Sequence, residues 1–235
     1  MTVWTILKKE LRVYFVSPLA YVFLSVFLLI AGMFFYLGIA LTGEASLRVM
    51  LGNLAVALIF ILPMLTMRQF AEEQRSGTFE LLMTSPIGLG SLILGKWLAP
   101  MVMCLLMLLG TAIFPAILAY YGDPDWGVVA TSYLGLLLVC AAFTAAGLFA
   151  SSLTNDQVAA GMGGIVLLLP FWVIGSAGTI VGERLQAILD HLALLPHLRS
   201  FTKGILDTTD IFYFVGFAFV FLFLTYRTLE SRRWR

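Results

Sequence analysis

Apolar side chains in this chain come in uninterrupted blocks rather than at the spacing of an amphipathic helix. A helix rises about 1.5 Å per residue, so roughly 20 apolar residues cross about 30 Å of hydrocarbon. Six blocks are near or above this length. The pattern therefore predicts an all-α, polytopic membrane protein with six transmembrane helices, at Pro18–Leu41, Met50–Met67, Leu92–Tyr121, Val128–Leu153, Val158–Val181 and Ile211–Leu229.

The first seventeen residues have a different pattern. Apolar and basic side chains alternate there at roughly helical spacing, which predicts an amphipathic helix lying in the membrane interface. Ser17-Pro18 should end that helix and turn the chain into the bilayer. Membrane lipid is the partner expected here, and the predicted interfacial anchors are Trp4, Lys8, Lys9 and Arg12.

The segment between the last two blocks, residues 182–210, is too long for a plain turn. It contains an apolar stretch, Leu185–Leu198, that is too short and too polar to span the membrane. We expect it to lie in the interface or to re-enter the bilayer where protein shields its backbone. It would act as a lid over the outer end of a transport path.

Composition agrees with a membrane protein, since 61% of residues are apolar and 11% are charged. A net charge of +1 offers no basic surface for nucleic acid, so no such partner is expected. The lysines and arginines fall mainly on one side if the N-terminus is inside the cell. We therefore expect cytoplasmic termini, a basic cytoplasmic tail at residues 230–235, and a location in the cytoplasmic membrane.

Residues 68–88 form an island of charge between two apolar blocks, on the predicted cytoplasmic side. Glu72 and Arg75 could pair at i, i+3 on a helix that begins near Gln69. Gly77 should interrupt this helix. Thr78 is a plausible N-cap for a second short helix with Glu80 in its first turn. Its apolar side, Phe79, Leu81 and Leu82, could enter a groove on a partner or dip into lipid.

The sequence contains little evidence for a catalytic motif. Residues 90–96 fit the spacing of a phosphate-binding loop, but Trp97 replaces the hydroxyl residue that would hold magnesium. Lys96 and Trp97 are instead predicted to be interfacial anchors. His191 and His197 could bind a metal or haem if they lay on facing elements, although a surface role fits better. The spans also lack the ionisable groups that an ion-coupled transporter needs.

Two stretches carry a family resemblance. RQFAEEQRSGTFELL at 68–82, followed by Thr84-Ser85-Pro86-Ile87, resembles the cytoplasmic loop of ABC type-2 exporter permeases, in particular the gliding-motility-type branch. Leu195-Pro196-His197 and the following Phe201–Asp207 resemble that branch's segment before the last span. The likeness covers essentially the whole chain.

The resemblance implies a coupling helix that contacts a separate ABC ATPase. That ATPase would bind ATP and Mg. This chain itself is expected to hold no cofactor or metal and to have no enzymatic activity. A second permease copy or paralogue would complete a dimeric path, and an accessory outer subunit is compatible with the likeness. The implied ATPase contacts are Glu72, Glu73, Arg75, Gly77, Thr78, Phe79, Glu80, Leu81 and Leu82, and the outer gate candidates are His197, Phe201, Gly204 and Asp207.

Two alternative functions stay open. One is a secondary transporter or channel, and the other is an intramembrane redox or metal protein that uses His191 and His197.

Helix packing is also predicted. Small residues at 141–147 and 159–164 should let the fourth and fifth spans approach closely. Pro63 is a candidate kink just before the charged island.

Overall fold

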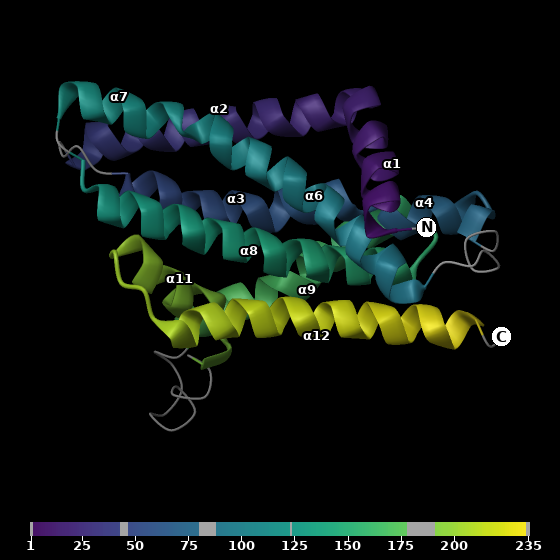
Figure 1. The fold of residues 1–235 in the computed structure, drawn as a ribbon. Coiled ribbons are helices and arrows are strands. Elements are labelled where there is room, and N and C mark those ends of the chain that lie inside the picture. The colour runs from purple at the N-terminus through teal and green to yellow at the C-terminus, as the bar shows by residue number, and fades with distance from the viewer. Residues whose placement is uncertain (1, 43–46, 80–87, 123, 178–190, 234–235) are drawn as a thin grey trace.

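The computed structural model describes residues 2–42, 47–79, 88–122, 124–177 and 191–233, which contain helices and no strand (Figure 1). Six helical stretches are long and apolar enough to span a membrane, as the sequence predicted. The helices are α1 (Val3–Val16), α2 (Pro18–Thr42), α3 (Arg48–Thr66), α4 (Arg68–Arg75), α6 (Leu89–Thr111), α7 (Ile113–Tyr121), α8 (Trp126–Leu153), α9 (Gln157–Ala177), α11 (Leu194–Thr202) and α12 (Thr208–Arg233).

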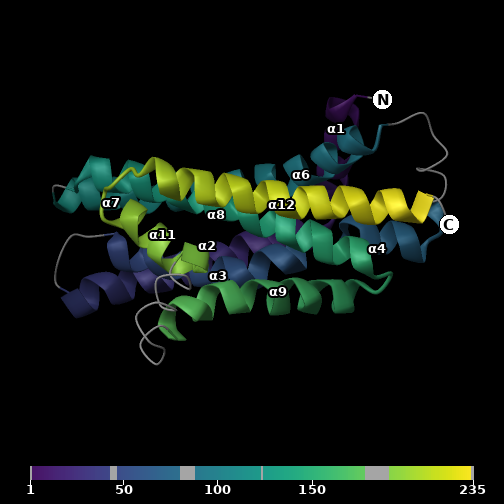
Figure 2. The same ribbon diagram turned by 90° about the horizontal axis from the view of Figure 1, so that it is seen from below.

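The short helix α1 runs across the direction of the long helices (Figures 1 and 2). The chain turns at Ser17, whose backbone is extended, and Pro18 then begins α2. Proline suits this position because the first N–H groups of a helix have no partner within the helix. The predicted break is thus confirmed. That α1 lies in the membrane interface stays a prediction.

The third predicted span, Leu92–Tyr121, consists of two helices. Pro115 lacks the N–H that would bond to the carbonyl of Thr111, and the chain tightens there with a bond from Ala112 N to Leu109 O at 3.1 Å. The Thr111 hydroxyl bonds to Leu108 O and to the hydroxyl of Tyr133 on α8. Helix α6 therefore ends at Thr111, and α7 begins at Ile113.

Helix α8 is the centre of the fold and packs against α3, α6, α9, α11 and α12. Its packing on α9 confirms the prediction made from small residues. At Gly164 of α9, an added Cβ would lie 2.8 Å from Pro63 Cβ and 3.6 Å from Gly147 Cα of α8. Pro63 lies inside α3 and does not end it. Three helices thus meet at two glycines and a proline.

The two ends of the bundle carry different elements. Both termini and α4 lie at one end, whereas α11 and the end of α7 lie at the other (Figure 1). An even number of spans requires this arrangement, and it agrees with the prediction that both termini share one side. Part of the predicted lid, residues 182–190, lies outside the described residues.

Candidate coupling site

Helix α4 leaves the bundle almost in line with α3, after the single residue Met67. The first N–H groups of a helix lack partners within it, so this junction needs donors and acceptors from elsewhere. The buried Ser151 of α8 supplies them. Its hydroxyl accepts from Phe70 N at 3.0 Å and Ala71 N at 3.1 Å, and donates to Met67 O at 2.9 Å. One side chain on the central helix thereby holds the base of α4.

The far side of α4 is tied to the ends of α8 and α12. Gln74 Nε2 donates to Ser152 O at 3.2 Å. Arg232 of α12 donates to Gln74 Oε1 and to Leu153 O. Helix α4 therefore cannot swing freely, and a force on it would act on both α3 and α8.

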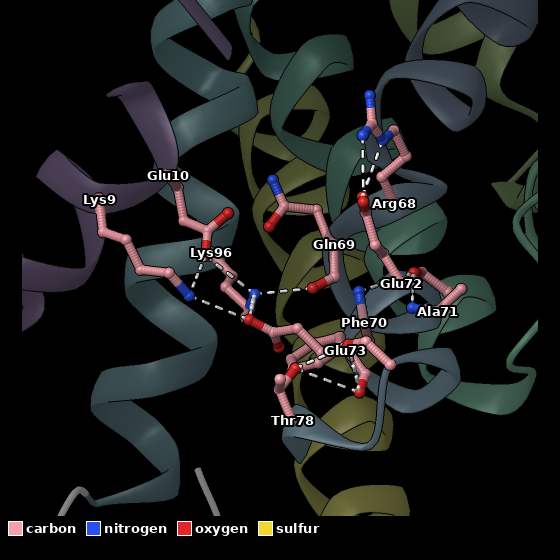
Figure 3. Close-up of polar contacts among 12 residues, drawn as sticks. Lys9, Glu10, Arg68, Gln69, Phe70, Ala71, Glu72, Glu73, Thr78 and Lys96 are labelled. Atoms are coloured by element: carbon pink, nitrogen blue, oxygen red, sulfur yellow. Dashed lines mark hydrogen bonds and ion pairs between the residues drawn. The ribbon is translucent and has the colours of Figure 1, made fainter. Parts of the chain in front are cut away.

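A charged cluster, formed by the largely buried Glu10, Glu73 and Lys96 and the exposed Lys9, joins α4 to α1 and α6 (Figure 3). Lys96 Nζ lies 3.0 Å from Glu10 Oε1, 2.9 Å from Glu73 Oε1 and 2.7 Å from Gln69 O. The ammonium donates hydrogen bonds to Glu10 and to the Gln69 carbonyl, and it forms an ion pair with Glu73. Its charge is also 5.2 Å from the centre of the Phe70 ring.

Two predicted anchors are corrected by these contacts. The side chain of Lys96 is only 1% exposed, so it cannot lie at the membrane surface as the sequence predicted. Trp97 is half-buried, and its Nε1 donates to Ala141 O of α8 at 3.1 Å. Both residues link helices within the bundle. Trp4, Lys8 and Arg12 are exposed, and their role as anchors stays a prediction.

Glycine at position 95 is what lets α1 approach α6. A Cβ there would lie 2.7 Å from Ile6 Cβ and 3.2 Å from Val3 O. The close contact places Glu10 within reach of the next residue on α6, Lys96. Burial raises the pKa of the Tyr14 hydroxyl on the same helix, which donates to Leu65 O at 2.9 Å. For Lys9, burial lowers the pKa, but the carboxylates of Glu73 and Glu10 outweigh burial and raise it.

The exposed tip after α4 has the joint that the sequence predicted. Gly77 has φ +71°, a backbone conformation that favours glycine. The predicted Glu72–Arg75 pair is wrong, because Glu72 accepts from Arg68 at 2.9 Å instead and Arg75 is exposed. Phe79 lies edge-on to Phe70 with ring centroids 6.5 Å apart. Of the implied ATPase contacts, Glu80, Leu81 and Leu82 lie outside the described residues.

Glu73 and Thr78 are the other implied contacts that the structure describes. Glu73 is part of the charged cluster rather than of the exposed tip. The Thr78 hydroxyl lies 2.9 Å from that of Ser76 and donates to Glu73 O at 3.4 Å. Thr78 is therefore at the exposed tip, next to Gly77 and Arg75.

The outer gate candidates lie together at the opposite end. Phe201 is fully buried against Gly135 of α8, and its carbonyl accepts from Thr131 at 2.9 Å, so it fastens α11 to α8. Gly204 has φ +86°. Asp207 is exposed and accepts from Thr209 N at 2.9 Å, and this bond lowers the pKa of its carboxyl group.

His197 is stacked on Tyr213 with ring centroids 4.1 Å apart. Its Nδ1 lies against Asp210 Oδ1, and its Nε2 lies 3.3 Å from His191 O. Both ring nitrogens are therefore already engaged with protein atoms. Within the described residues, no group of three metal-ligating side chains is found.

Sequence reasoning missed three residues at this site, Glu10, Ser151 and Arg232, and it gave a fourth, Lys96, a different role. A charged residue within an apolar block needs a partner, and this rule was the available signal for Lys96. The other three act through contacts between residues far apart in sequence, which no local pattern reveals.

The geometry describes a rigid lever, held at its base and exposed at its tip, at the end of a six-span helical bundle. Comparison with known families agrees with this architecture. A family model described as "ABC-2 family transporter protein" matches residues 4–234. A search among curated proteins finds no match. This chain, a multi-pass membrane permease, thus belongs to the ABC-2 family of transporter proteins.

Proposed function

We propose that this chain is the membrane subunit of an ATP-driven exporter of the gliding-motility-type branch, powered by a separate ATPase that docks at the α4 end. Two copies, or this chain and a paralogue, form the translocation path in the inner membrane of a prokaryote, with both termini cytoplasmic. The ATPase binds ATP and Mg.

One observation carries the proposal. Helix α4 continues α3 and is fixed to α8 by Ser151, so displacement of its exposed tip is passed to two spans at once. A coupling element must be rigid, since a floppy loop would absorb the motion of the partner. Beyond its base, Arg75, Ser76, Gly77 and Thr78 are exposed and free of the core, as a docking tip requires.

The two alternatives have less support. Apart from Lys96, charged side chains in the described spans lie at helix ends, whereas ion-coupled transporters carry ionisable groups near the membrane midplane. The redox alternative needs the ring nitrogens of His197, and these contact Asp210 and a backbone carbonyl.

Arg75 is the residue with which to test the ATPase contact. A Glu73 variant would be ambiguous, because it would also break the charged cluster. We expect Arg75→Glu to weaken binding of the ATPase encoded beside this chain about tenfold or more, since like charges at an interface cost several kcal/mol. Stimulation of nucleotide hydrolysis by the permease should fall in parallel.

The matched control is Arg199→Glu, the same charge reversal at an exposed arginine of α11, at the opposite end of the bundle. It should leave ATPase binding unchanged. If Arg75→Glu bound and stimulated the ATPase normally, or if both variants lost binding equally, docking at α4 would be refuted.

A further inference from the structure

The ring of His197 on α11 is held against α12, at the end of the bundle opposite α4. Its Nδ1 lies 2.5 Å from Oδ1 of Asp210, and its Nε2 lies 3.3 Å from the backbone oxygen of His191. A backbone oxygen and an ionised carboxylate both accept hydrogen bonds and donate none. A neutral imidazole has one N–H and can donate to only one of these oxygens, whereas an imidazolium can donate to both.

The carboxylate of Asp210 depends on this ring for its counter-charge. Asp210 is 6% exposed, and its second oxygen, Oδ2, has no hydrogen-bond partner among the residues that the structure describes. In the same part of the chain, His197 is its one ion-pair partner. A buried carboxylate whose partner becomes neutral is costly. The contact between α11 and α12 therefore favours the charged form of the ring.

Tyr213, almost one turn further along α12, favours the same form. Its ring is stacked on that of His197, with centroids 4.1 Å apart and planes 19° apart. A cation over the face of an aromatic ring is attracted by its π electrons. The Tyr213 hydroxyl also donates to Leu192 O at 2.6 Å, so α12 holds the chain just before α11 as well.

Few other charges of the described residues come near the ring. Hydrogen bonds in the first turn of α12 and, less strongly, the charge of His197 lower the pKa of the Asp207 carboxyl, which is thus a second carboxylate nearby. Arg199 of α11 is exposed. Helix α11 also packs against α3, α8 and α9, which together contain one acidic or basic side chain, Arg48 at the first residue of α3. The hydroxyl of Tyr133 on α8 is engaged with α6.

We propose that protonation of His197 controls whether α11 stays attached to α12. The ring holds α11 when both nitrogens carry a proton. Loss of one proton to water breaks one of its two hydrogen bonds and leaves the buried Asp210 without a counter-charge. The side chain of His197 is 11% exposed, which gives water a route to the ring.

The sign of the effect follows from the charged form. Attachment is complete at low pH and weakens as the pH rises through the range in which histidine titrates, about pH 5 to 8. The contact lies between α11 and α12 alone, so the inference depends neither on an ATPase nor on what the chain transports.

Labelling of a buried cysteine in the purified full-length permease measures the release of α11. Leu198 of α11 is 2% exposed, so Leu198→Cys should react with a maleimide only when α11 moves away from the bundle. Lys203→Cys, at the exposed end of α11, reports the ordinary rise of thiol reactivity with pH, and the ratio of the two rates cancels this rise. We expect the ratio to increase about tenfold from about pH 6 to about pH 8, the contribution of one hydrogen bond to a charged group. A constant ratio would overturn the proposal.

Substitutions at the two histidines assign the effect to one ring. In His197→Gln the side chain cannot become charged, so the ratio should be high at every pH. His191→Gln is the matched control, because it makes the same change at the nearby histidine and keeps the backbone oxygen that faces His197. It should keep the tenfold increase. An increase that persists in His197→Gln, or that is lost equally in both variants, would refute the role of His197.

Nitrogen NMR observes the ring itself and decides the question if Leu198→Cys does not fold. The chain has two histidines, so His191→Gln with isotopically labelled histidine leaves the signals of His197 alone. Both ring nitrogens should have the chemical shift of a protonated nitrogen at about pH 6, and one of them should lose it as the pH rises. One protonated and one unprotonated nitrogen already at the lower pH would overturn the proposal.

Discussion

Lys96 is the residue on which three helices depend at the α4 end. It pairs with Glu10 of α1 and Glu73 of α4 from its place in α6. Lys96→Met removes the buried cation and leaves Glu10 and Glu73 with the exposed Lys9 as their one remaining partner in the charged cluster. We expect a loss of about 3 to 5 kcal/mol, the usual result of removing one partner of a buried ion pair. Equilibrium unfolding in mixed micelles would measure it.

The control for this prediction removes the stranded charges as well. Lys96→Met combined with Glu10→Gln and Glu73→Gln should recover much of the stability, because the cost lies in unpaired charge rather than in lost packing. A single variant as stable as the parent protein would show that the charged cluster contributes nothing to the fold.

Ser151 and Ser152 are adjacent buried serines whose hydroxyl groups have different hydrogen-bond partners. Ser151 joins α8 to three backbone groups at the α3–α4 junction, whereas Ser152 donates to Phe149 O of its own helix at 2.7 Å. Ser151→Ala should cost about 2 kcal/mol, since it leaves two N–H groups and one carbonyl of α4's base without their partner. Thermal unfolding in detergent should show a much smaller effect of Ser152→Ala. If the two substitutions lowered the stability equally, Ser151 would not be what fixes the α3–α4 junction to α8.

The error over Lys96 shows where sequence reasoning stops at this scale. A lysine beside a tryptophan near the start of an apolar block is the usual pattern of an interfacial anchor. What buries Lys96 is the approach of α1, permitted by Gly95, and this contact joins residues more than eighty positions apart. Local pattern identified the type of residue correctly but could not identify its partner.

At the scale of elements, hydropathy was enough to locate all six long helices, because a membrane span needs an apolar run whatever its packing. It could not tell which prolines interrupt a helix. Pro63, Pro100 and Pro170 lie inside helices, whereas the chain breaks just before Pro115. Pro63 packs against Gly147 of α8 and Gly164 of α9. These contacts depend on the tertiary structure, so the local sequence could not reveal them.

Neighbouring glycines of α9 test that packing. An alanine at Gly164 would place Cβ 2.8 Å from Pro63 Cβ, whereas one at Gly163 would meet nothing within 4 Å. Gly164→Ala should therefore destabilise the protein by about 1 to 3 kcal/mol through overpacking. Gly163→Ala should be neutral or slightly stabilising, because alanine favours helix over glycine. Unfolding measured under the same conditions compares the two, and similar results would mean that α3 and α9 do not meet as described.

At the scale of the whole molecule, the two ends of the bundle are built for different tasks. One end carries the termini, the charged cluster and an exposed tip beyond α4. The other carries α11, which Phe201 fastens to α8 through its buried ring and its carbonyl. The proposed function requires that the α4 end face the cytoplasm, where ATP is available. Positive charge along the chain favours this orientation, and it can be measured directly.

Two variants that each add one exposed cysteine report the orientation, because the native Cys104 and Cys140 are buried and should react little. Ser76→Cys lies at the exposed tip after α4, and Lys203→Cys lies at the exposed end of α11. With a membrane-impermeant maleimide, Ser76→Cys should be labelled in inside-out vesicles and Lys203→Cys in right-side-out vesicles. The opposite pattern would place the α4 tip outside the cell, where no ATPase could act on it, and the coupling proposal would fall together with the topology. Labelling of both variants from one side would instead contradict the six-span count, since three of the six candidate spans lie between the two positions and an odd number of crossings puts them on opposite sides.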